Sequence, residues 1–368
     1  MIFNGKTKSV TLILTQQCNL SCVYCYESKK TFSCMSFATA QKILYSELTA
    51  NDSTEFVDIN LFGGEPFLQF DLIRQITDFL LSNSFPKKWN LSTITNGTLV
   101  HDEIQEWLIS HRNIFSLSLS LDGSKRSHDL NRNNSFDQID LAFFKNFFDT
   151  QIKMTISQYT LPALSEDVIF LHSQGFSIAN NLAYGIPWDN PIYYSTLISE
   201  LEKLIEYYIK HPDISECSML SFPYMEISRN HGKFYRNCSA GHELHAYDTD
   251  GVLYPCHMLT PFSVGMEKAP SVNKIVFPDN ELDPLLLDNH CYNCSILSSC
   301  QTCYASNFIE FGNIYHRNPA MCKINRIIFH AKASLYAQKW DRKLLSLSLE
   351  EEKALLDAIQ LVEKLPLT

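Results

Sequence analysis

The stretch of sequence that decides the fold is Val10-Thr11-Leu12-Ile13-Leu14, followed three residues later by Cys18-Asn19-Leu20-Ser21-Cys22-Val23-Tyr24-Cys25. The first five residues are apolar or β-branched, which is typical of a short buried strand. The loop after this strand places three thiols at C-x3-C-x2-C spacing. Three thiolates can hold three irons of a 4Fe–4S cluster and leave the fourth iron open. The alternatives are a zinc site, which more often uses paired C-x2-C motifs, or three unrelated buried cysteines.

The open iron of such a cluster can bind a small molecule through an amine and a carboxylate, and S-adenosylmethionine (SAM) offers both groups. The three cysteines and the aromatic Tyr24 resemble the signature loop of the radical SAM enzymes. In that family the loop follows the first strand of a barrel, and the residue before the third cysteine packs near the adenine of SAM. The resemblance implies that Cys18, Cys22 and Cys25 hold the SAM cluster and that Tyr24 contacts SAM.

The composition narrows the class of protein. The chain has 368 residues, 45% of them apolar, which is enough for one large domain and a smaller one. A net charge of −10 argues against a nucleic-acid partner. The sequence shows no membrane-spanning run and no signal peptide, which predicts a cytoplasmic protein. Disulfides are rare in that compartment, so the twelve cysteines favour metal or cluster ligation.

Short apolar runs alternate with amphipathic segments through the first half of the chain. The runs predict strands over residues 9–14, 56–62, 91–95, 115–121, 152–157 and 178–184. The amphipathic segments predict helices over residues 36–49, 71–83, 100–111, 136–149, 165–174 and 194–210. Six strand–helix units predict a parallel sheet and are too few for an eight-unit barrel. We therefore expect an α/β fold with a partial (β/α)6 barrel, which resembles the radical SAM core.

Chemistry in parallel barrels lies at the C-terminal ends of the strands, so site motifs are expected to follow the strands. Gly63-Gly64-Glu65-Pro66 follows the second strand. Glycine lets the backbone approach a ligand closely, and the Glu65 carboxylate accepts hydrogen bonds from an ammonium group. An ordinary glycine-rich turn is the alternative. The motif resembles the GGEP sequence of the family, which holds the amino group of SAM.

Polar or aromatic residues also follow the later strands. Ser120 and Asp122 are two residues apart and so share one face of the fourth strand. The resemblance implies that Asn96 lines the SAM pocket, that Ser120 contacts SAM and that Asp122 shapes the pocket. It also places Tyr184 where family members offer backbone contacts to the adenine. Gln158, at the end of the fifth strand, is a further candidate, while turn roles are the alternative for Asn96 and Asp122.

A second group of seven cysteines lies between residues 238 and 322. Seven ligands are awkward for two all-cysteine zinc sites, which use eight, but suit one four-cysteine and one three-cysteine cluster. The arrangement resembles the SPASM domain, which carries two auxiliary 4Fe–4S clusters. The resemblance assigns Cys238, Cys256 and Cys303 to the first auxiliary cluster, and Cys291, Cys294, Cys300 and Cys322 to the second. Because these ligands interleave, metal binding and folding are expected to be coupled. Zinc remains the alternative.

Two features depart from the SPASM pattern. Two residues, rather than the usual three, separate Cys300 from Cys303. No additional cysteine follows Cys238 within a few residues, so the first auxiliary cluster either keeps an open iron or takes His242 or His245 as its fourth ligand. Surface exposure of these histidines is the alternative.

The patterns divide the chain into four parts. We expect the partial barrel over residues 1–190, a bridging segment over 191–234, the iron–sulfur domain over 235–330 and a helical tail over 331–368. The C-terminal region, residues 318–368, is expected to form two helices. One begins at Asn318-Pro319 and the other spans Leu349 to Leu365, with three glutamates in its first turn.

The resemblance implies a reaction and its partners. A reduced cluster donates an electron to SAM, and the resulting 5′-deoxyadenosyl radical removes hydrogen from a carbon of the substrate. With three 4Fe–4S clusters, the enzyme would cross-link or oxidise a ribosomally made peptide. A flavodoxin or ferredoxin is the expected electron donor. The segment before Val10 is too short for a leader-binding domain, so either a separate protein or residues 187–234 are expected to supply that function if it is needed.

Two other functions are considered. Anaerobic sulfatase maturases convert Cys or Ser to formylglycine, and in them an Asp base follows the cysteine of a GxxxxC motif. Here Gly251 and Cys256 form that motif and His257 follows it. His257 is therefore a candidate base, with a solvent-facing turn residue as the alternative. A non-catalytic iron–sulfur electron carrier is the third possibility, and the motif ending in Glu65 and Pro66 argues against it.

Overall fold

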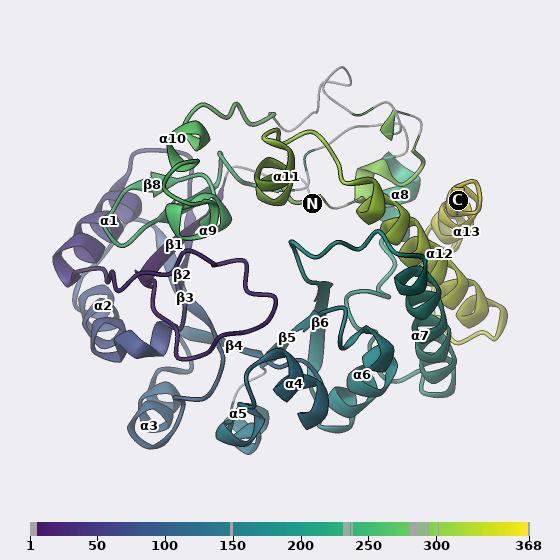
Figure 1. Ribbon diagram of the computed structural model, residues 1–368, viewed down its shortest axis with the longest axis horizontal. Coiled ribbons are helices and arrows are strands. Elements are labelled where there is room, and N and C mark those ends of the chain that lie inside the picture. The colour runs from purple at the N-terminus through teal and green to yellow at the C-terminus, as the bar shows by residue number, and fades with distance from the viewer. Residues whose placement is uncertain are drawn as a thin grey trace.

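The computed structural model describes residues 6–147, 150–230, 236, 238–279, 288, 291–292, 294–300 and 302–366. Its centre is one sheet with the strand order β6-β5-β4-β3-β2-β1-β7-β8. Neighbouring strands from β6 to β7 run parallel, and only β8 is antiparallel to its neighbour. The sheet curves into an arc that does not close on itself, as Figure 1 shows. The predicted partial barrel is confirmed.

The strands lie where the apolar runs predict them, within a few residues at each end. Their bounds are β1 Thr7–Thr15, β2 Phe56–Gly63, β3 Lys88–Thr95, β4 Phe115–Ser120, β5 Gln151–Ile156, β6 Ser177–Leu182, β7 Leu244–Tyr247 and β8 Leu253–Tyr254. Strands β7 and β8 were not predicted. They come from the second cysteine region, yet β7 pairs with β1 and extends the barrel sheet.

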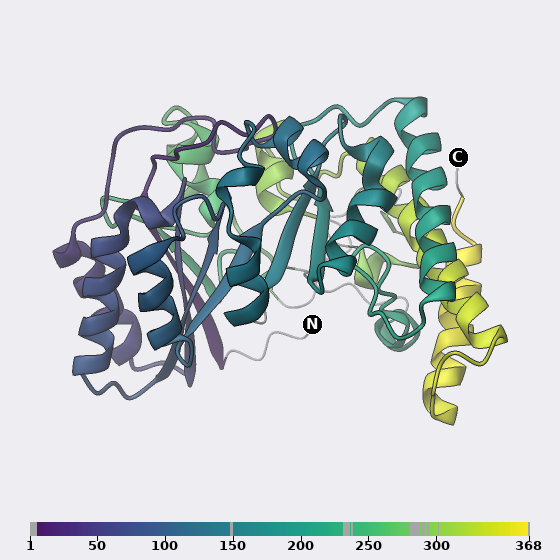
Figure 2. The same ribbon diagram turned by 90° about the horizontal axis from the view of Figure 1, so that it is seen from below.

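Helices α1 to α6 lie on the outer side of the arc (Figures 1 and 2). The helices of the barrel and its bridge are α1 Phe37–Thr49, α2 Phe70–Ser82, α3 Asp102–His111, α4 Lys125–Asn131, α5 Leu141–Phe147, α6 Leu164–Ser173, α7 Pro191–Lys210 and α8 Tyr224–Asn230. The predicted helix over 136–149 is shorter than expected, although residues 148–149 lie outside the described part. Helix α4, which the sequence patterns did not predict, precedes it.

The C-terminal helices are α9 Pro261–Val264, α10 Ala269–Val272, α11 Tyr304–Phe311, α12 Pro319–Asp341 and α13 Leu349–Glu363. The two tail helices confirm the prediction. Asn318 caps α12 by accepting hydrogen bonds from two backbone N–H groups, and Ser348 and Glu351 form a capping box on α13. The segment that carries α9 to α11 lies across the open side of the arc (Figure 1). No helix in the described ranges is long and apolar enough to cross a membrane.

The two faces of the sheet differ in chemistry. Residues of one face, such as Ile59, Leu117 and Ile152, are fully or almost fully buried in the main apolar core with helices α1 to α6. The alternate residues face the inner, concave side of the arc and stay partly exposed. Many of these inner residues are polar: Asp58, Asn60, Asn90, Ser92, Ser118, Ser120, Lys153 and Thr155. The apolar face holds the barrel together, and the concave face is left for a polar ligand.

Candidate active site

The cysteine loop is held against the end of β2 by two glycines. A Cβ atom added to Gly64 would lie 2.2 Å from the carbonyl oxygen of Gln17 and 2.9 Å from the Cβ of Cys18. One added to Gly63 would lie 2.4 Å from the carbonyl oxygen of Thr15. The backbone N–H of Gly64 donates to this Thr15 oxygen at 3.0 Å. The close approach that these glycines allow is therefore to the cysteine loop itself, whereas the motif alone predicts an approach to a ligand.

Glu65 joins the ends of two strands. It is 1% exposed, and its carboxylate accepts hydrogen bonds from the Thr95 hydroxyl at 2.8 Å and the Asn96 N–H at 2.8 Å. A third comes from the Phe67 N–H at 3.1 Å, at the start of the short helix that contains Pro66. Burial raises the pKa of Glu65, although these hydrogen bonds oppose the shift. A carboxylate has about four acceptor positions, and these three hydrogen bonds leave one of them for a further donor.

Asn96 connects the end of β3 to the cysteine loop. Its Nδ2 donates to Asn19 Oδ1 at 2.9 Å, and Asn19 Nδ2 donates to Thr98 Oγ1 at 2.7 Å. Thr98 in turn donates to Asn96 Oδ1 through its N–H and its hydroxyl. This closed set of hydrogen bonds fixes Asn19, which lies next to Cys18. The Asn96 side chain therefore positions the loop, a role that the sequence analysis did not assign to it.

Asp122 is fully buried and is a centre of hydrogen bonds. Tyr24 donates its hydroxyl to Asp122 Oδ2 at 2.6 Å, and Arg132 donates to both carboxylate oxygens at 3.0 and 3.2 Å. The Thr155 N–H and the Asn131 side chain donate as well. The Arg132 guanidinium also lies 5.4 Å from the centre of the Tyr24 ring. Asp122 and Arg132 thus hold Tyr24 in place. No sequence pattern predicted Arg132 as a site residue.

The three thiols of the loop lie among cations. Burial raises the pKa of Cys18 to about 11 and raises those of Cys22 and Cys25. Lys30 opposes the shift at all three and hydrogen-bonds the Cys25 sulfur, while Arg132 opposes it at Cys22. These cations favour the thiolate form, which metal binding requires. Lys30 was not predicted as a site residue, although its place five residues after Cys25 could have indicated it.

Three other predicted residues lie around the concave face or its rim. Ser120 is half-buried, and no hydrogen bond to its hydroxyl is formed by the described residues. Gln158 has a buried Oε1 without a hydrogen-bond partner, which leaves an acceptor for a ligand. Tyr184 is 40% exposed, and its hydroxyl hydrogen-bonds the sulfur of Cys303. The side chain of Tyr184 therefore contacts the second cysteine group.

The second cysteine group separates into two sets in space. The thiols close enough to raise the pKa of Cys256 are those of Cys303 and Cys238. The thiols close enough to raise the pKa of Cys291 are those of Cys300, Cys322 and Cys294. These are the same two sets that the resemblance assigned to two clusters. Burial raises the pKa of every thiol in these sets for which a shift is resolved, and Arg317 opposes the shift at Cys291, Cys294 and Cys300.

The histidines of this region have different surroundings. His257 is half-buried between aromatic rings, with ring centres 4.8 Å from Phe62 and 6.3 Å from Tyr26, and burial lowers its pKa to about 4. It is therefore not the solvent-facing turn residue considered as an alternative. His245 Nδ1 hydrogen-bonds Glu47 Oε1 at 2.5 Å, which commits that ring to helix α1. His242 has a buried Nε2 without a hydrogen-bond partner.

Tyr26 links the two cysteine groups. It follows Cys25 directly and packs against the small apolar cluster that contains Cys256 and Tyr254. The thiols of Cys25, Cys256 and Cys303 are all close enough to raise the pKa of its hydroxyl. One aromatic side chain therefore lies between the loop after β1 and the first set of the second group.

Residues 12–165 match the Radical SAM superfamily. This part of the chain is a radical SAM domain. This result favours catalysis over the non-catalytic electron carrier considered above. A relative, the radical SAM cyclopropyl synthase TigE of Paramaledivibacter caminithermalis, is 21% identical over 357 residues, which cover 87% of this chain and 73% of TigE. The cysteine-type anaerobic sulfatase-maturating enzyme of Clostridium novyi is 23% identical over 346 residues, which cover 80% of this chain and 87% of that enzyme.

The fold of this chain is similar to that of solved structures. The structure of native anSMEcpe with bound AdoMet and the Kp18Cys peptide matches with a TM-score of 0.69 at 18% sequence identity. The match covers 91% of this chain and 99% of that one. The likeness therefore extends beyond the barrel to the C-terminal region.

Membership of this superfamily implies a 4Fe–4S cluster and SAM, and the donor set of the site fits both. Cys18, Cys22 and Cys25 offer three thiols, one fewer than a complete four-cysteine set. Among the described residues, no three His, Cys, Asp or Glu side chains converge on a single-ion position. A zinc site needs such convergence, with sulfurs about 2.3 Å from one ion, whereas cluster cysteines each bind a different iron. The superfamily match is what favours a cluster.

Proposed function

We propose that this radical SAM enzyme is a peptide maturase that forms a cross-link or an oxidised residue in a ribosomally synthesised peptide. The observation that carries the proposal is the position of Tyr26, which lies next to both cysteine groups. A substrate bound near Tyr26 would lie within reach of both groups. This placement suits a reaction in which a substrate carbon first loses a hydrogen atom and then an electron.

In the proposal, Cys18, Cys22 and Cys25 hold the SAM cluster. Bound there, the cluster and SAM supply a 5′-deoxyadenosyl radical that removes a hydrogen atom from an unreactive carbon. Glu65 accepts a hydrogen bond from the amino group of SAM through its remaining acceptor position. Tyr24, fixed by Asp122 and Arg132, covers the adenine side.

Further contacts to SAM are proposed from the end of each later strand. Ser120 and Gln158 offer polar atoms that are free of hydrogen bonds from the described residues. Asn96 and Tyr184 would contribute through their backbone, because their side chains hold Asn19 and Cys303. Gly63, Gly64 and Pro66 shape the turn that carries Glu65.

The second cysteine group is proposed to hold two auxiliary 4Fe–4S clusters, three clusters in all. Cys238, Cys256 and Cys303 would hold the first, and Cys291, Cys294, Cys300 and Cys322 the second. His242, with its buried unpaired Nε2, stays a candidate for the fourth ligand of the first cluster, while His245 is committed to Glu47. Arg317 donates to the Cys300 sulfur at 3.3 Å and would offset the charge of the second cluster.

The peptide substrate is proposed from the relatives and from the site. The solved relative holds a peptide with AdoMet, and the concave face offers the polar groups that a peptide backbone needs. A flavodoxin or ferredoxin is the proposed electron donor, and leader recognition is proposed for a separate protein or for residues 187–234. The division at 190, 234 and 330 stays a proposal, and residue 234 lies outside the described part.

Sulfatase maturation is the second candidate function. It is supported by the likeness to the Clostridium novyi enzyme over most of both chains. In either reaction His257 is the proposed base, because its ring lies between Tyr26 and Phe62 at the end of β2. The presence of His where that branch has Asp favours peptide maturation.

The test uses the anaerobically reconstituted protein with SAM and a strong reductant. We expect 5′-deoxyadenosine by liquid chromatography, and mass spectrometry should show loss of two hydrogens from a small peptide encoded beside this gene. An aldehyde-reactive probe on a sulfatase-motif peptide separates the two candidates. Formylglycine on that peptide, without change in the neighbouring peptide, would replace the first function by the second.

A further inference from the structure

A cavity of about 1150 Å³ lies between strand β6, residues 214–223 and helix α12. Its lining includes the four thiols proposed to hold the second auxiliary cluster, here called the four-cysteine set: Cys291, Cys294, Cys300 and Cys322. Arg317 and Asn325, whose side chains carry N–H donors, line the same cavity. Both of them donate a hydrogen bond to one sulfur of the set, that of Cys300.

Arg317 brings a positive charge to this sulfur. Its Nη1 lies 3.3 Å from Cys300 Sγ, and the side chain is 8% exposed. The backbone N–H of Arg317 donates to Asp288 Oδ2 at 2.7 Å, which fixes the chain just before helix α12. Within the described ranges, no carboxylate forms a salt bridge with the Arg317 guanidinium. Its charge opposes the rise in pKa of three of the four thiols, so it acts on most of the set.

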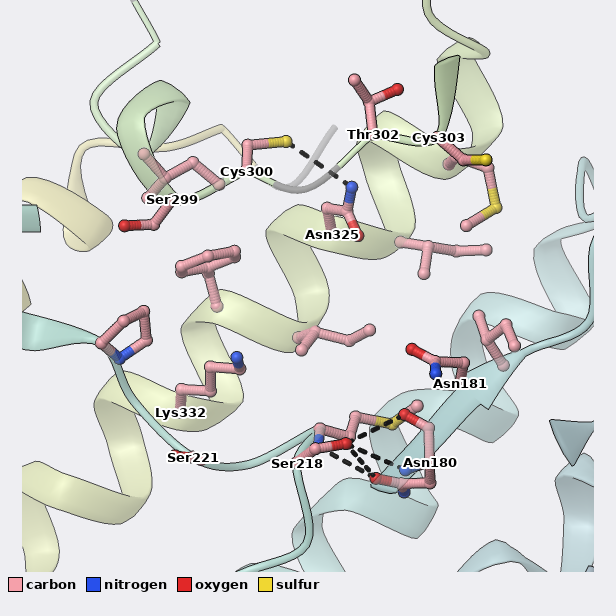
Figure 3. A pocket seen from close by; sticks show the side chains of 18 of the residues that line it. Asn180, Asn181, Ser218, Ser221, Ser299, Cys300, Thr302, Cys303, Asn325 and Lys332 are labelled. Carbon is pink, nitrogen blue, oxygen red and sulfur yellow. Dashed lines mark hydrogen bonds between the residues drawn. The ribbon is translucent and has the colours of Figure 1, made fainter. Parts of the chain in front are cut away.

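Asn325 adds a neutral donor to the same sulfur. Its Nδ2 lies 3.6 Å from Cys300 Sγ and points to it from α12, as Figure 3 shows. The same helix carries Cys322, three residues earlier, so one rigid element supplies both a thiol of the set and a donor to it. Cys300 is only 8% exposed. Hydrogen bonds to a charged sulfur are stronger in such a site than in water.

The three thiols proposed for the first auxiliary cluster have different surroundings. The cation near them is Arg236, which opposes the rise in pKa of Cys238 and forms a salt bridge with Glu243 at 2.6 Å. The Cys303 sulfur takes a hydrogen bond from the Tyr184 hydroxyl, which is a neutral donor. A carboxylate therefore offsets the cation beside the first cluster, whereas Arg317 keeps its charge for the second.

These differences matter because the reduction potential of a 4Fe–4S cluster depends on its net charge and on hydrogen bonds to its sulfurs. Four thiolates bring one more negative charge than three, so the second cluster would be the harder one to reduce if nothing offset that charge. Reduction adds a further negative charge, which a buried guanidinium at hydrogen-bond distance stabilises.

We propose that Arg317, assisted by Asn325, raises the reduction potential of the second auxiliary cluster through hydrogen bonds to the Cys300 sulfur. The inference rests on the proposed function for the presence of that cluster. Arg317 contacts a cluster ligand and not the substrate, so its role is to tune the cluster. A more easily reduced second cluster would favour movement of an electron away from the substrate.

The test is a potentiometric titration followed by electron paramagnetic resonance. It uses the full chain with Cys22→Ala and Cys25→Ala, which should keep only the two auxiliary clusters and so show two midpoint potentials. Arg317→Met should make one cluster about tenfold less reduced at a fixed potential, a shift of about 59 mV for one electron. The other midpoint should not move. Tyr184→Phe removes the hydroxyl from Cys303 and should move that other midpoint, which identifies it as the first cluster.

Arg317→Lys keeps the charge and should recover about half of the shift, while Asn325→Leu should lower the same midpoint by about twofold to threefold in the same ratio. Arg342→Met, at an exposed arginine that follows α12, is the matched control and should move neither midpoint. A change below about twofold in Arg317→Met at full iron content would overturn the inference, as would an equal shift in Arg342→Met. If Arg317→Met loses iron, unchanged midpoints in both Arg317→Lys and Asn325→Leu would overturn it.

The outcomes separate this inference from the proposed function. A midpoint that depends on Arg317, without modification of any peptide, would leave the inference and remove the peptide maturase. Peptide maturation together with midpoints that do not respond to Arg317→Met would do the reverse. About four irons in the Cys22→Ala, Cys25→Ala chain, in place of about eight, would remove the second auxiliary cluster and the inference with it.

Discussion

The two cysteine groups of this radical SAM enzyme are supported in different ways. The loop of Cys18, Cys22 and Cys25 is attached by hydrogen bonds to the ends of β2 and β3, and Asp122, after β4, holds its Tyr24. The second group lies among two- to four-residue elements such as β8, α9 and α10, with small apolar clusters of its own. The comparison predicts that the protein alone builds the first site, whereas the second would depend on the proposed auxiliary clusters.

Removing cysteines from each group should show which group needs metal in order to fold. We expect these variants to have the largest effects on activity and on protease resistance. Cys22→Ala with Cys25→Ala should abolish 5′-deoxyadenosine formation, because the proposed SAM cluster would lose two of its three ligands. The thermal unfolding of the metal-free chain should stay within about 2 °C. Cys294→Ala with Cys300→Ala should leave SAM cleavage measurable but make residues 238–322 sensitive to protease. Iron content, product analysis and limited proteolysis are the measurements.

Cys34→Ala serves as the control for both double variants, since Cys34 is exposed and lies outside both groups. It should change neither activity nor proteolysis. If residues 238–322 stayed resistant to protease in Cys294→Ala with Cys300→Ala, the second cysteine group would not depend on bound metal for its folding.

Asp122→Asn tests how firmly the protein builds the first site. The substitution leaves the buried Arg132 without its charged partner, and breaking a buried ion pair costs about 3–5 kcal/mol. We therefore expect the free energy of unfolding of the barrel to fall by about 3 kcal/mol in urea denaturation. SAM binding should also weaken, because both oxygens of Asp122 accept hydrogen bonds and the NH2 group of Asn would face a donor, either Tyr24 or the Thr155 N–H.

Asp137→Asn is the matched control. Asp137 pairs with Lys125 at the surface, and exposed pairs contribute at most about 1 kcal/mol. If Asp122→Asn cost no more than this control, the first loop would not be held by the buried pair, and the contrast between the two groups would weaken.

Much of the barrel and its cysteine loop could be predicted, because the sequence patterns that indicate them are local. Apolar runs gave strands β1 to β6, and spacing gave the three thiols. The link from Tyr24 through Asp122 to Arg132 could not be predicted, since no pattern states which buried charge meets which. The pairing of β7 with β1 was missed for a related reason: four residues carry little periodicity, and the contact joins segments more than 200 residues apart. The role of Gly64 depends on the position of Gln17, which only the folded chain reveals.

A smaller effect on stability is expected at the contact that joins β7, near the second cysteine group, to helix α1 of the barrel. Glu47 of α1 is 5% exposed and accepts hydrogen bonds from three groups: His245 Nδ1 at 2.5 Å and the Tyr247 hydroxyl at 2.6 Å, both on β7, and Lys8 at 3.0 Å. Burial alone would raise the pKa of Glu47, but the hydrogen bonds outweigh it and lower the pKa to about 2. The ionised carboxylate therefore fastens β7 to the barrel.

Because the folded-state pKa of Glu47 lies below the unfolded value of about 4.3, its contribution is present above that pH and is lost as the pH falls toward 2. The shift corresponds to about 3 kcal/mol, which solvent screening reduces to about 2–3 kcal/mol. Glu47→Gln should lower the free energy of unfolding of the metal-free chain by that order at pH 7 and flatten its decline between pH 4.5 and 3. Glu55→Gln, at an exposed pair with Lys6, should leave the decline unchanged. Parallel acid limbs for wild type and Glu47→Gln would show that β7 is held by its backbone pairing with β1 alone.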